Sequence, residues 1–174
     1  SDRMTGKNGS WHIELDGISQ ETALKIAERD DVVSIGAVTI FNPDGELPYR
    51  MDGKRVVLYG IDESYLTMNS TGAAEGRFPQ GMGEIMLSSN AARVLQVAVG
   101  DTVTLRTPSG DWDFTVSGLG GVEESYYSGQ YSLMDAYLPR TAFAALMEQN
   151  NVHNLQTSYY VQFTSASKAA KAIP

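Results

Sequence analysis

The sequence of 174 residues predicts an α+β fold in which two β-α-β units form a base and a small antiparallel β subdomain is inserted between them. Two observations predict this class. A strand, a helix and a second strand are expected at each end of the chain, whereas the middle holds short β-prone runs separated by turn residues. A chain of this length buries about 70% of the surface that its unfolded form exposes, which suffices for a stable core. We expect residues 1–48 and 123–174 to form the base and residues 49–122 to form the inserted subdomain.

The first β-α-β unit is expected near the start of the chain. Apolar and polar residues alternate over Trp11–Leu15, which predicts a half-buried strand. Ser19 is a suitable N-cap, and Ala23 and Ile26 follow it at helical spacing, so a helix is expected next. The run Val32–Phe41 is rich in β-branched residues and predicts the second strand.

The middle of the chain is expected to consist mainly of strands. One helix is predicted among them, because Ser88 or Ser89 can cap a helix that ends near Leu95. The clearest hairpin signal is the sequence Pro-Ser-Gly-Asp at residues 108–111. Together these runs predict a small antiparallel sheet or a partly closed barrel. Its predicted strands are Val56–Ile61, Glu84–Leu87, Thr102–Thr107 and Trp112–Leu119.

The last third of the chain repeats the pattern of the beginning. A strand is predicted over Leu133–Leu138, and Pro139 is well placed to start a helix. That helix presents Phe143, Leu146 and Met147 on one face, which predicts burial of this face. A final strand is predicted over Tyr159–Thr164. These elements complete the second predicted β-α-β unit.

The overall charge and composition exclude several classes of function. The formal net charge is -8 and the isoelectric point is about 4.7, so the chain repels nucleic-acid backbones and anionic membrane surfaces. Cysteine is absent, which excludes disulfides, thiol catalysis and cysteine-ligated zinc. A cationic or neutral partner is favoured. No run approaches the roughly 18 consecutive apolar residues of a membrane helix.

The ionisable residues do not form a recognisable catalytic or metal-binding pattern. His12 and Glu14 alternate on a predicted strand, which is the wrong spacing for a helical zinc motif, and His153 is the only other histidine. The pairs Asp30–Asp31 and Glu123–Glu124 are adjacent in sequence, so their side chains diverge and are expected to be solvated. No phosphate-binding loop or nucleophile elbow occurs. The sequence therefore predicts a non-enzymatic domain with no catalytic residue, metal ligand or cofactor of its own.

One segment combines acidic and aromatic residues. Between Arg106 and Arg140 there is no lysine or arginine, while carboxylates and tyrosines accumulate. Tyrosines give a large contact area at low entropic cost and carboxylates attract cations, so this segment is a candidate contact surface for a cationic or amphipathic partner. The alternative is an acidic loop whose tyrosines partly cover the core. The candidate contact residues are Glu123, Glu124, Tyr126, Tyr127 and Tyr131.

Six short blocks in a fixed order carry a resemblance to a known family. Each block alone is explained by turn geometry, because the glycines permit tight turns at strand ends. In combination they resemble the MacB-like periplasmic core domain of FtsX-like ABC transporter permeases. The blocks are Gly60-Ile61-Asp62 with Tyr65, Glu75-Gly76-Arg77, Gly83–Ser88, Ala91–Leu95, Val99–Leu105 and Phe114–Gly118.

The resemblance implies a domain outside the cytoplasm, between the first two transmembrane helices of a permease, with the base next to the membrane. It also implies a permease dimer and a separate ATPase subunit that uses the ATP, and a role in coupling membrane motion to the handling of a peptide, drug, lipoprotein or partner protein. Two alternatives stay open: an independent secreted solute-binding or adhesion protein, and a hydrolase whose pocket gathers acidic and histidine residues from distant segments.

Overall fold

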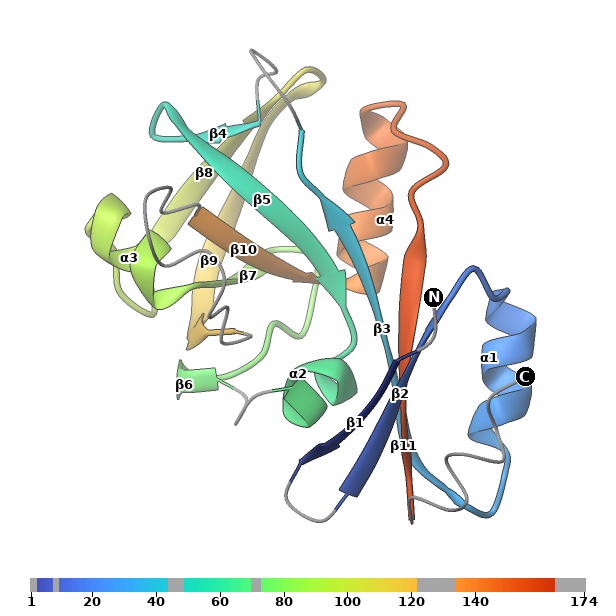
Figure 1. The fold of residues 1–174 in the computed structure, drawn as a ribbon. Coiled ribbons are helices and arrows are strands. Elements are labelled where there is room, and N and C mark those ends of the chain that lie inside the picture. Colours follow the sequence, from blue (N-terminus) through green and yellow to red (C-terminus); the bar gives the residue numbers. More distant parts are fainter. Residues whose placement is uncertain (1–2, 8–9, 44–48, 70–72, 122–133, 165–174) are drawn as a thin grey trace.

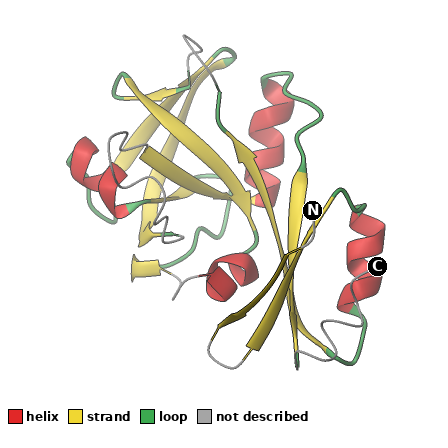
Figure 2. Ribbon diagram, in the orientation of Figure 1, coloured by secondary structure: helices red, strands yellow, loops and turns green. Residues whose placement is uncertain are grey.

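The computed structural model describes residues 3–7, 10–43, 49–69, 73–121 and 134–164. It has a mixed α/β arrangement in which four helices surround one continuous sheet (Figures 1 and 2). The helices are α1 (Gln20–Ala27), α2 (Glu63–Asn69), α3 (Ser89–Leu95) and α4 (Arg140–Gln149). The strands are β1 (Arg3–Lys7), β2 (Ser10–Asp16), β3 (Val32–Phe41), β4 (Arg50–Met51), β5 (Lys54–Ile61), β6 (Ala73–Gly76), β7 (Glu84–Leu87), β8 (Thr102–Thr107), β9 (Gly110–Gly120), β10 (Met134–Pro139) and β11 (Thr157–Phe163).

Six strands close into a barrel. They pair in the order β5-β10-β7-β9-β8-β4, and β4 pairs with β5 to complete the ring. The β5–β10 and β7–β9 pairs are parallel, whereas the other pairs are antiparallel. Closure leaves none of the ring strands as a bare sheet edge, and the interior is filled by apolar side chains such as Leu58, Ile85 and Leu105, each fully buried.

Of the other five strands, β6 pairs with β9 of the barrel, and the remaining four form an open sheet in the order β1-β2-β11-β3. Strand β11 lies between β2 and β3 and is antiparallel to both, so β2 and β3 run parallel to each other on either side of it. Helix α1 packs against one face of this sheet, and the core there is formed by residues such as Ile13, Leu15, Val161 and Ala23. Ser19 caps α1 by accepting a hydrogen bond from the Thr22 backbone at 3.1 Å.

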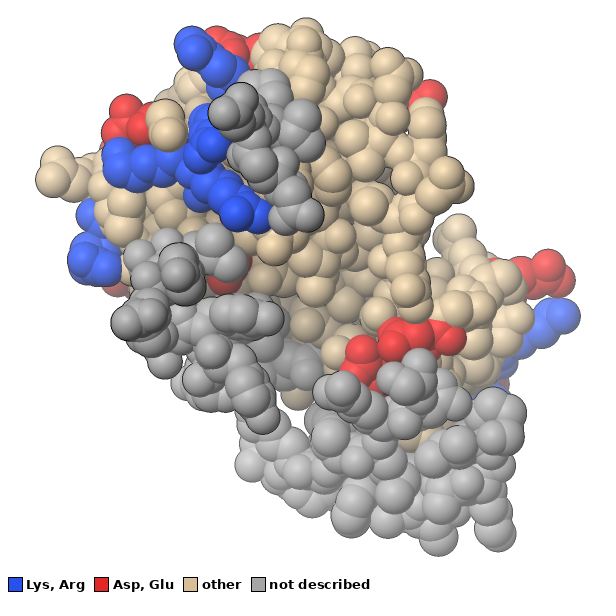
Figure 3. All heavy atoms as spheres, turned by 45° about the horizontal axis from the view of Figure 1, so that its top comes forward, with Lys and Arg blue, Asp and Glu red and all other residues tan. Residues whose placement is uncertain are grey.

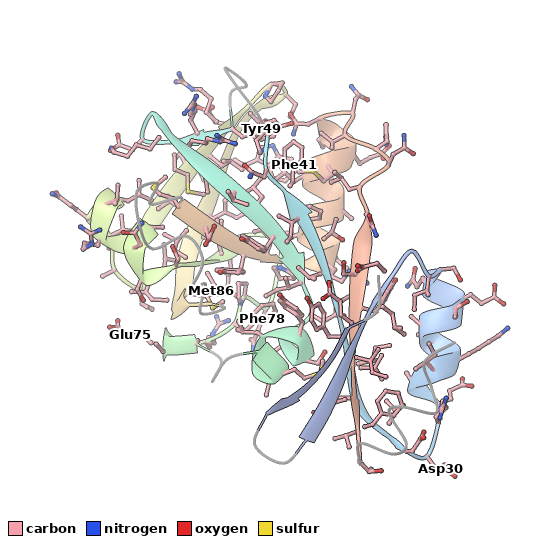
Figure 4. All side chains as sticks on the ribbon, in the orientation of Figure 1. Asp30, Phe41, Tyr49, Glu75, Phe78 and Met86 are labelled. Atoms are coloured by element: carbon pink, nitrogen blue, oxygen red, sulfur yellow. The ribbon has the colours of Figure 1, made fainter. Side chains whose placement is uncertain are left out.

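Strand β3 belongs to both parts of the molecule. Its residues from Val32 to Thr39 pair with β11 of the open sheet, and its residues from Val38 to Phe41 pair with β5 of the barrel. At its barrel end, Phe41 packs edge-on against Tyr49, with ring centroids 4.8 Å apart (Figure 4). A single ten-residue strand therefore joins the two parts without an intervening loop.

Helix α2 fixes β3 at the junction. Gly36 lies so close to the Tyr65 backbone that a Cβ atom at this position would clash with it. The Ala37 amide donates to a carboxylate oxygen of Asp62 at 2.9 Å, and the Asp62 amide donates to the Ala37 carbonyl at 3.1 Å. The Ser64 hydroxyl donates to the Ile35 carbonyl at 2.7 Å. The start of α2 is thus tied to three consecutive residues of β3.

Most predicted elements are confirmed, but their assembly differs from the prediction in two ways. The predicted inserted sheet is not purely antiparallel, because β7 and β9 are joined by a crossover through α3 and β8 and pair in parallel. The strand predicted to begin the second base unit is β10, which pairs with β5 and β7 in the barrel, so only β11 of that unit lies beside the strands of the first unit. Strands β1, β4 and β6 and helix α2 were not predicted. The subdomain boundaries stay a prediction.

Candidate functional site

The predicted contact residues lie outside the described part of the chain. Glu123, Glu124, Tyr126, Tyr127 and Tyr131 all fall within residues 122–133. Two aromatic neighbours of that segment are described, and both are structural. Tyr137 is 1% exposed and stacks on Tyr59 with ring centroids 4.8 Å apart, and Trp112 stacks on Phe114 within β9. The proposed contact surface therefore stays a prediction.

The described residues contain no group of three or more histidine, aspartate or glutamate side chains arranged to hold a metal ion. His12 lies in β2 and His153 lies in the connection between α4 and β11. Asp31 pairs with Arg29 at 2.8 Å and so contributes to local structure. Of the acidic pairs considered, the one at residues 123–124 lies outside the described residues.

A groove of about 250 Å³ runs along α4. One wall is a stripe of the helix at the spacing i, i+3, i+4, i+7 and i+8, so these side chains lie on one face. Phe143 and Met147 line it as the edge of the barrel core, each only 5% exposed, and Ala144 is exposed between them. The stripe begins with Arg140 and ends with Glu148, which places opposite charges at its two ends.

The opposite wall comes from β3, β11 and the connection that precedes β11 (Figure 1). The hydroxyls of Thr39 and Thr157 are 2.6 Å apart and hydrogen-bond to each other across the two strands. Leu155 adds apolar surface, and Asn154, whose φ is 64°, shapes the connection. The groove is thus built where α4, which packs on the barrel, meets the strands of the open sheet.

Close packing holds α4 against the barrel beside this groove. A Cβ atom at Gly60 of β5 would clash with the ring of Phe143, so glycine at this position lets the helix approach the strand. At its other end, α4 is tied to the β8–β9 hairpin, because the Ser109 amide donates to the Asn150 side chain at 2.9 Å. Both ends of the groove wall are therefore fixed to the barrel.

A second hollow, of about 330 Å³, lies over β4 and β8. The strand register aligns Arg55, Arg50 and Arg106 across β5, β4 and β8, and Figure 3 shows Lys and Arg side chains gathered over the barrel. Carboxylates accompany them: Lys54 pairs with Asp52 at 3.3 Å, and Arg106 lies 3.8 Å from Asp111. This hollow carries compensated charge and is less suited than the α4 groove to select a ligand by charge.

An ion pair closes the loop between β6 and β7. The Arg77 guanidinium contacts both carboxylate oxygens of Glu84, one of them at 2.8 Å, and the Gln80 amide donates to the same carboxylate at 2.9 Å. These bonds to the charged form lower the pKa of Glu84, first through the Arg77 hydrogen bond and second through the Gln80 amide. These contacts hold the loop in one conformation. Met82, which lies within the loop, is 49% exposed.

An acidic and aromatic surface also lies on the face of the open sheet away from α1. Tyr160 of β11 is directly opposite Glu14 of β2 and packs edge-on against Tyr65 with ring centroids 4.9 Å apart. Burial raises the pKa of Tyr160, and the negative charges of Tyr65, Glu14 and Asp16 raise it further. Alternation along β2 and β11 predicts this shared face, but which strands become neighbours depends on the fold.

Sequence reasoning missed the α4 groove. The signal was present as the five-residue stripe with charged ends, but only the burial of Phe143 and Met147 was inferred from it. The other wall comes from strands whose positions relative to α4 depend on tertiary structure.

Comparisons with known proteins were made for the sequence and for the fold. No curated protein sequence matches the chain. The periplasmic region of MacB from Actinobacillus actinomycetemcomitans superposes with a TM-score of 0.63 at 16% identity, over 91% of this chain and 72% of that chain. A domain of a putative permease from Porphyromonas gingivalis superposes with a TM-score of 0.57 at 17% identity, over 83% of this chain and 61% of that chain. These likenesses show a shared fold.

No helix in the described residues is long and apolar enough to cross a membrane. The family profile of the MacB-like periplasmic core domain matches residues 3–173, which is nearly the whole chain. The chain therefore belongs to the family of MacB-like periplasmic core domains of ABC transporter permeases.

Proposed function

We propose that this domain couples ATP-driven motion of a membrane-embedded permease to the binding or release of a partner outside the cytoplasm. The observation that supports coupling is the continuity of β3, which pairs with the open sheet along most of its length and with the barrel at its end. A strand that is hydrogen-bonded to neighbours in both parts transmits displacement better than a loop does, because its ladder bonds fix its backbone relative to those neighbours.

The positions of the first and last described strands support coupling that runs from the open sheet to the barrel. The first described strand, β1, and the last, β11, both belong to the open sheet. Membrane helices attached at these ends would therefore act on the open sheet first, and β3 and α2 would pass the motion to the barrel. An ATPase subunit that hydrolyses the ATP and a second permease copy are the partners that this proposal requires.

Cysteine accessibility in the full-length protein tests the location. This segment has no native cysteine, so Met82→Cys, in a full-length protein whose other cysteines are replaced by serine, introduces a single thiol at an exposed position. We expect labelling by a membrane-impermeant maleimide in intact cells with a permeabilised outer envelope, and sedimentation of the protein with membranes. The control Ala136→Cys, at a fully buried position, stays unlabelled until the protein is denatured. Labelling only after lysis contradicts the location, and labelled protein in the soluble fraction favours the secreted alternative.

Loosening the junction tests the coupling. Asp62→Ala removes the acceptor of the Ala37 amide, whereas Glu63→Ala changes its exposed neighbour and serves as the control. In the permease reconstituted with its ATPase, we expect Asp62→Ala to keep basal ATP hydrolysis and to weaken transport or partner release per ATP. Equal transport per ATP in the two variants, with both folded, would contradict coupling through this junction.

A further inference from the structure

The α4 groove has a positive side chain at one end and a negative side chain at the other. Arg140 and Glu148 are eight residues apart on one helix face, so their Cα atoms are separated by about 12 Å along the axis. The helix dipole has the same sense, because its positive end lies at the Arg140 end and its negative end at the Glu148 end. Both fields favour a ligand whose negative group lies near Arg140 and whose positive group lies near Glu148.

Neither end charge is neutralised by the described residues. The guanidinium of Arg140 lies 6.0 Å above the ring of Tyr159, and no described carboxylate is within ion-pair distance of it. Glu148 is exposed and has no described cation within that distance. In a chain with a net charge of -8, an arginine that stacks on an aromatic ring instead of pairing with an acid is a candidate anchor for an external carboxylate.

The size and lining of the groove restrict what it can hold. Its volume of about 250 Å³ is below the range of about 300–1,000 Å³ that is usual for small-molecule sites, so it can take up a side chain of a ligand whose backbone lies along the open groove. Between the charges, Phe143 and Met147 offer a small apolar contact, each 5% exposed, which suits one aliphatic side chain. Thr39, Thr157, His153 and Asn154 add polar groups that can bond to a peptide backbone. An extended chain rises about 3.3 Å per residue, so three or four residues span the distance between Arg140 and Glu148.

We propose that this groove binds a short free peptide of three or four residues in an extended conformation. Its carboxyl terminus pairs with Arg140, its ammonium terminus pairs with Glu148, and an aliphatic side chain packs on Phe143 and Met147. This inference deepens the proposed function by naming a ligand class and its site. The cysteine-labelling result does not depend on the groove, so a failure of peptide binding and a wrong location are distinguishable.

The test is a titration of the 174-residue chain with the peptide Ala-Leu-Leu-Ala in three forms: with both termini free, with an acetylated amino end, and with an amidated carboxyl end. We expect the free form to bind and each blocked form to bind about tenfold more weakly, since a charge-assisted bond is lost. Arg140→Met, which keeps an apolar stem over Tyr159, and Glu148→Gln should each weaken the free peptide by a similar factor.

The decisive outcome is a double-mutant cycle between protein and peptide. Arg140→Met should not weaken binding of the amidated peptide further, because that peptide has no carboxylate to pair with Arg140. Likewise, Glu148→Gln should not weaken binding of the acetylated peptide further, because that peptide has no ammonium group to pair with Glu148. Additive losses would place the termini elsewhere and overturn the assignment. Binding that is equal for all three forms, or no binding of the free form by calorimetry and by NMR chemical shifts, also overturns it.

Two kinds of control variant separate binding from folding. Ala144→Phe fills the centre of the groove from an exposed helix position and should abolish binding while the melting temperature is kept. Arg93→Met and Glu63→Gln remove exposed charges far from the groove and should leave the peptide affinity unchanged. If Ala144→Phe binds the free peptide as the unmodified chain does, the groove is not the site.

Discussion

The barrel and the open sheet differ in whether their edge strands are paired. In the barrel, the β4–β5 pairing closes the ring, and its strands enclose one large apolar cluster that also takes in α4. The open sheet ends at β1, has α1 on one face, and rests on a smaller cluster around Ile13 and Val161. From this difference we expect the barrel to be the more rigid part and the open sheet to have the lower free energy of local opening.

The two parts also differ in what they offer to a partner. The barrel contributes a fixed wall through α4, whereas the open sheet contributes the strands that face it across the groove. A change in the angle between the two parts would change the width of the groove. Ligand affinity and the position of the open sheet would then be linked.

The largest effect is expected from a cavity in the barrel. Leu58 is fully buried in β5, and Leu58→Ala should lower the free energy of unfolding by about 2–5 kcal/mol. Chemical denaturation followed by circular dichroism measures this loss. As a control, Leu24→Ala changes an apolar residue that is 59% exposed on α1 and should shift stability by less than about 0.5 kcal/mol. A loss below about 1 kcal/mol for Leu58→Ala would argue against a tightly packed barrel.

A matched cavity in the open sheet should act more locally. Val161→Ala removes two methyl groups at a fully buried position of β11 and should cost about 1.5–3 kcal/mol. In hydrogen exchange we expect faster exchange in β2, β11 and the first part of β3, with barrel amides little changed. Uniform acceleration over both parts would mean that the molecule opens as one cooperative unit and would contradict a lower local stability of the open sheet.

Alkaline titration compares a tyrosine from each part. Burial raises the pKa of both Tyr160 in the open sheet and Tyr49 beside the barrel, and nearby charges add to the shift only at Tyr160. Because each folded pKa lies above the unfolded value of 10.0, the neutral phenol contributes stability below that pH and the contribution is lost as the pH rises above it. Tyr160→Phe should therefore flatten the alkaline loss of stability more than Tyr49→Phe does. The same slope for both variants would contradict a larger pKa shift at Tyr160.

The smallest effect is expected at the Arg77–Glu84 ion pair. The folded pKa of Glu84 is below its ordinary value of 4.5, so the contribution of this pair is present above that pH and is lost as the pH falls below it. Glu84→Gln should leave a slightly less stable protein whose melting temperature depends less on acid pH. Glu75→Gln, at an exposed residue in β6, is the control. Salt should reduce the difference, because exposed pairs are screened.

The sequence predicted local structure better than it predicted the assembly. Ser19 and Ser88 act as N-caps, and the run Val32–Phe41 forms one strand, because caps and β-branched runs act locally. The pairing of β10 with β5 and β7 was not predicted, because its residues are mostly buried and a continuous apolar run does not reveal its neighbours. The two-residue strand β4, which closes the barrel, is too short to give a periodic signal.

The position of β11 constrains the order in which the molecule can be completed. All barrel strands lie between residues 50 and 139, so the ring can close before the last strand is synthesised. The open sheet cannot, because its central strand comes last and both β2 and β3 expose an unpaired edge until it arrives. During synthesis the chain therefore passes through a stage in which the barrel is complete and β2 and β3 each have an unpaired edge that can associate with other chains. A fragment ending at residue 156 should show protected barrel amides and a tendency to associate, and a monomeric fragment with a disordered barrel would contradict this order.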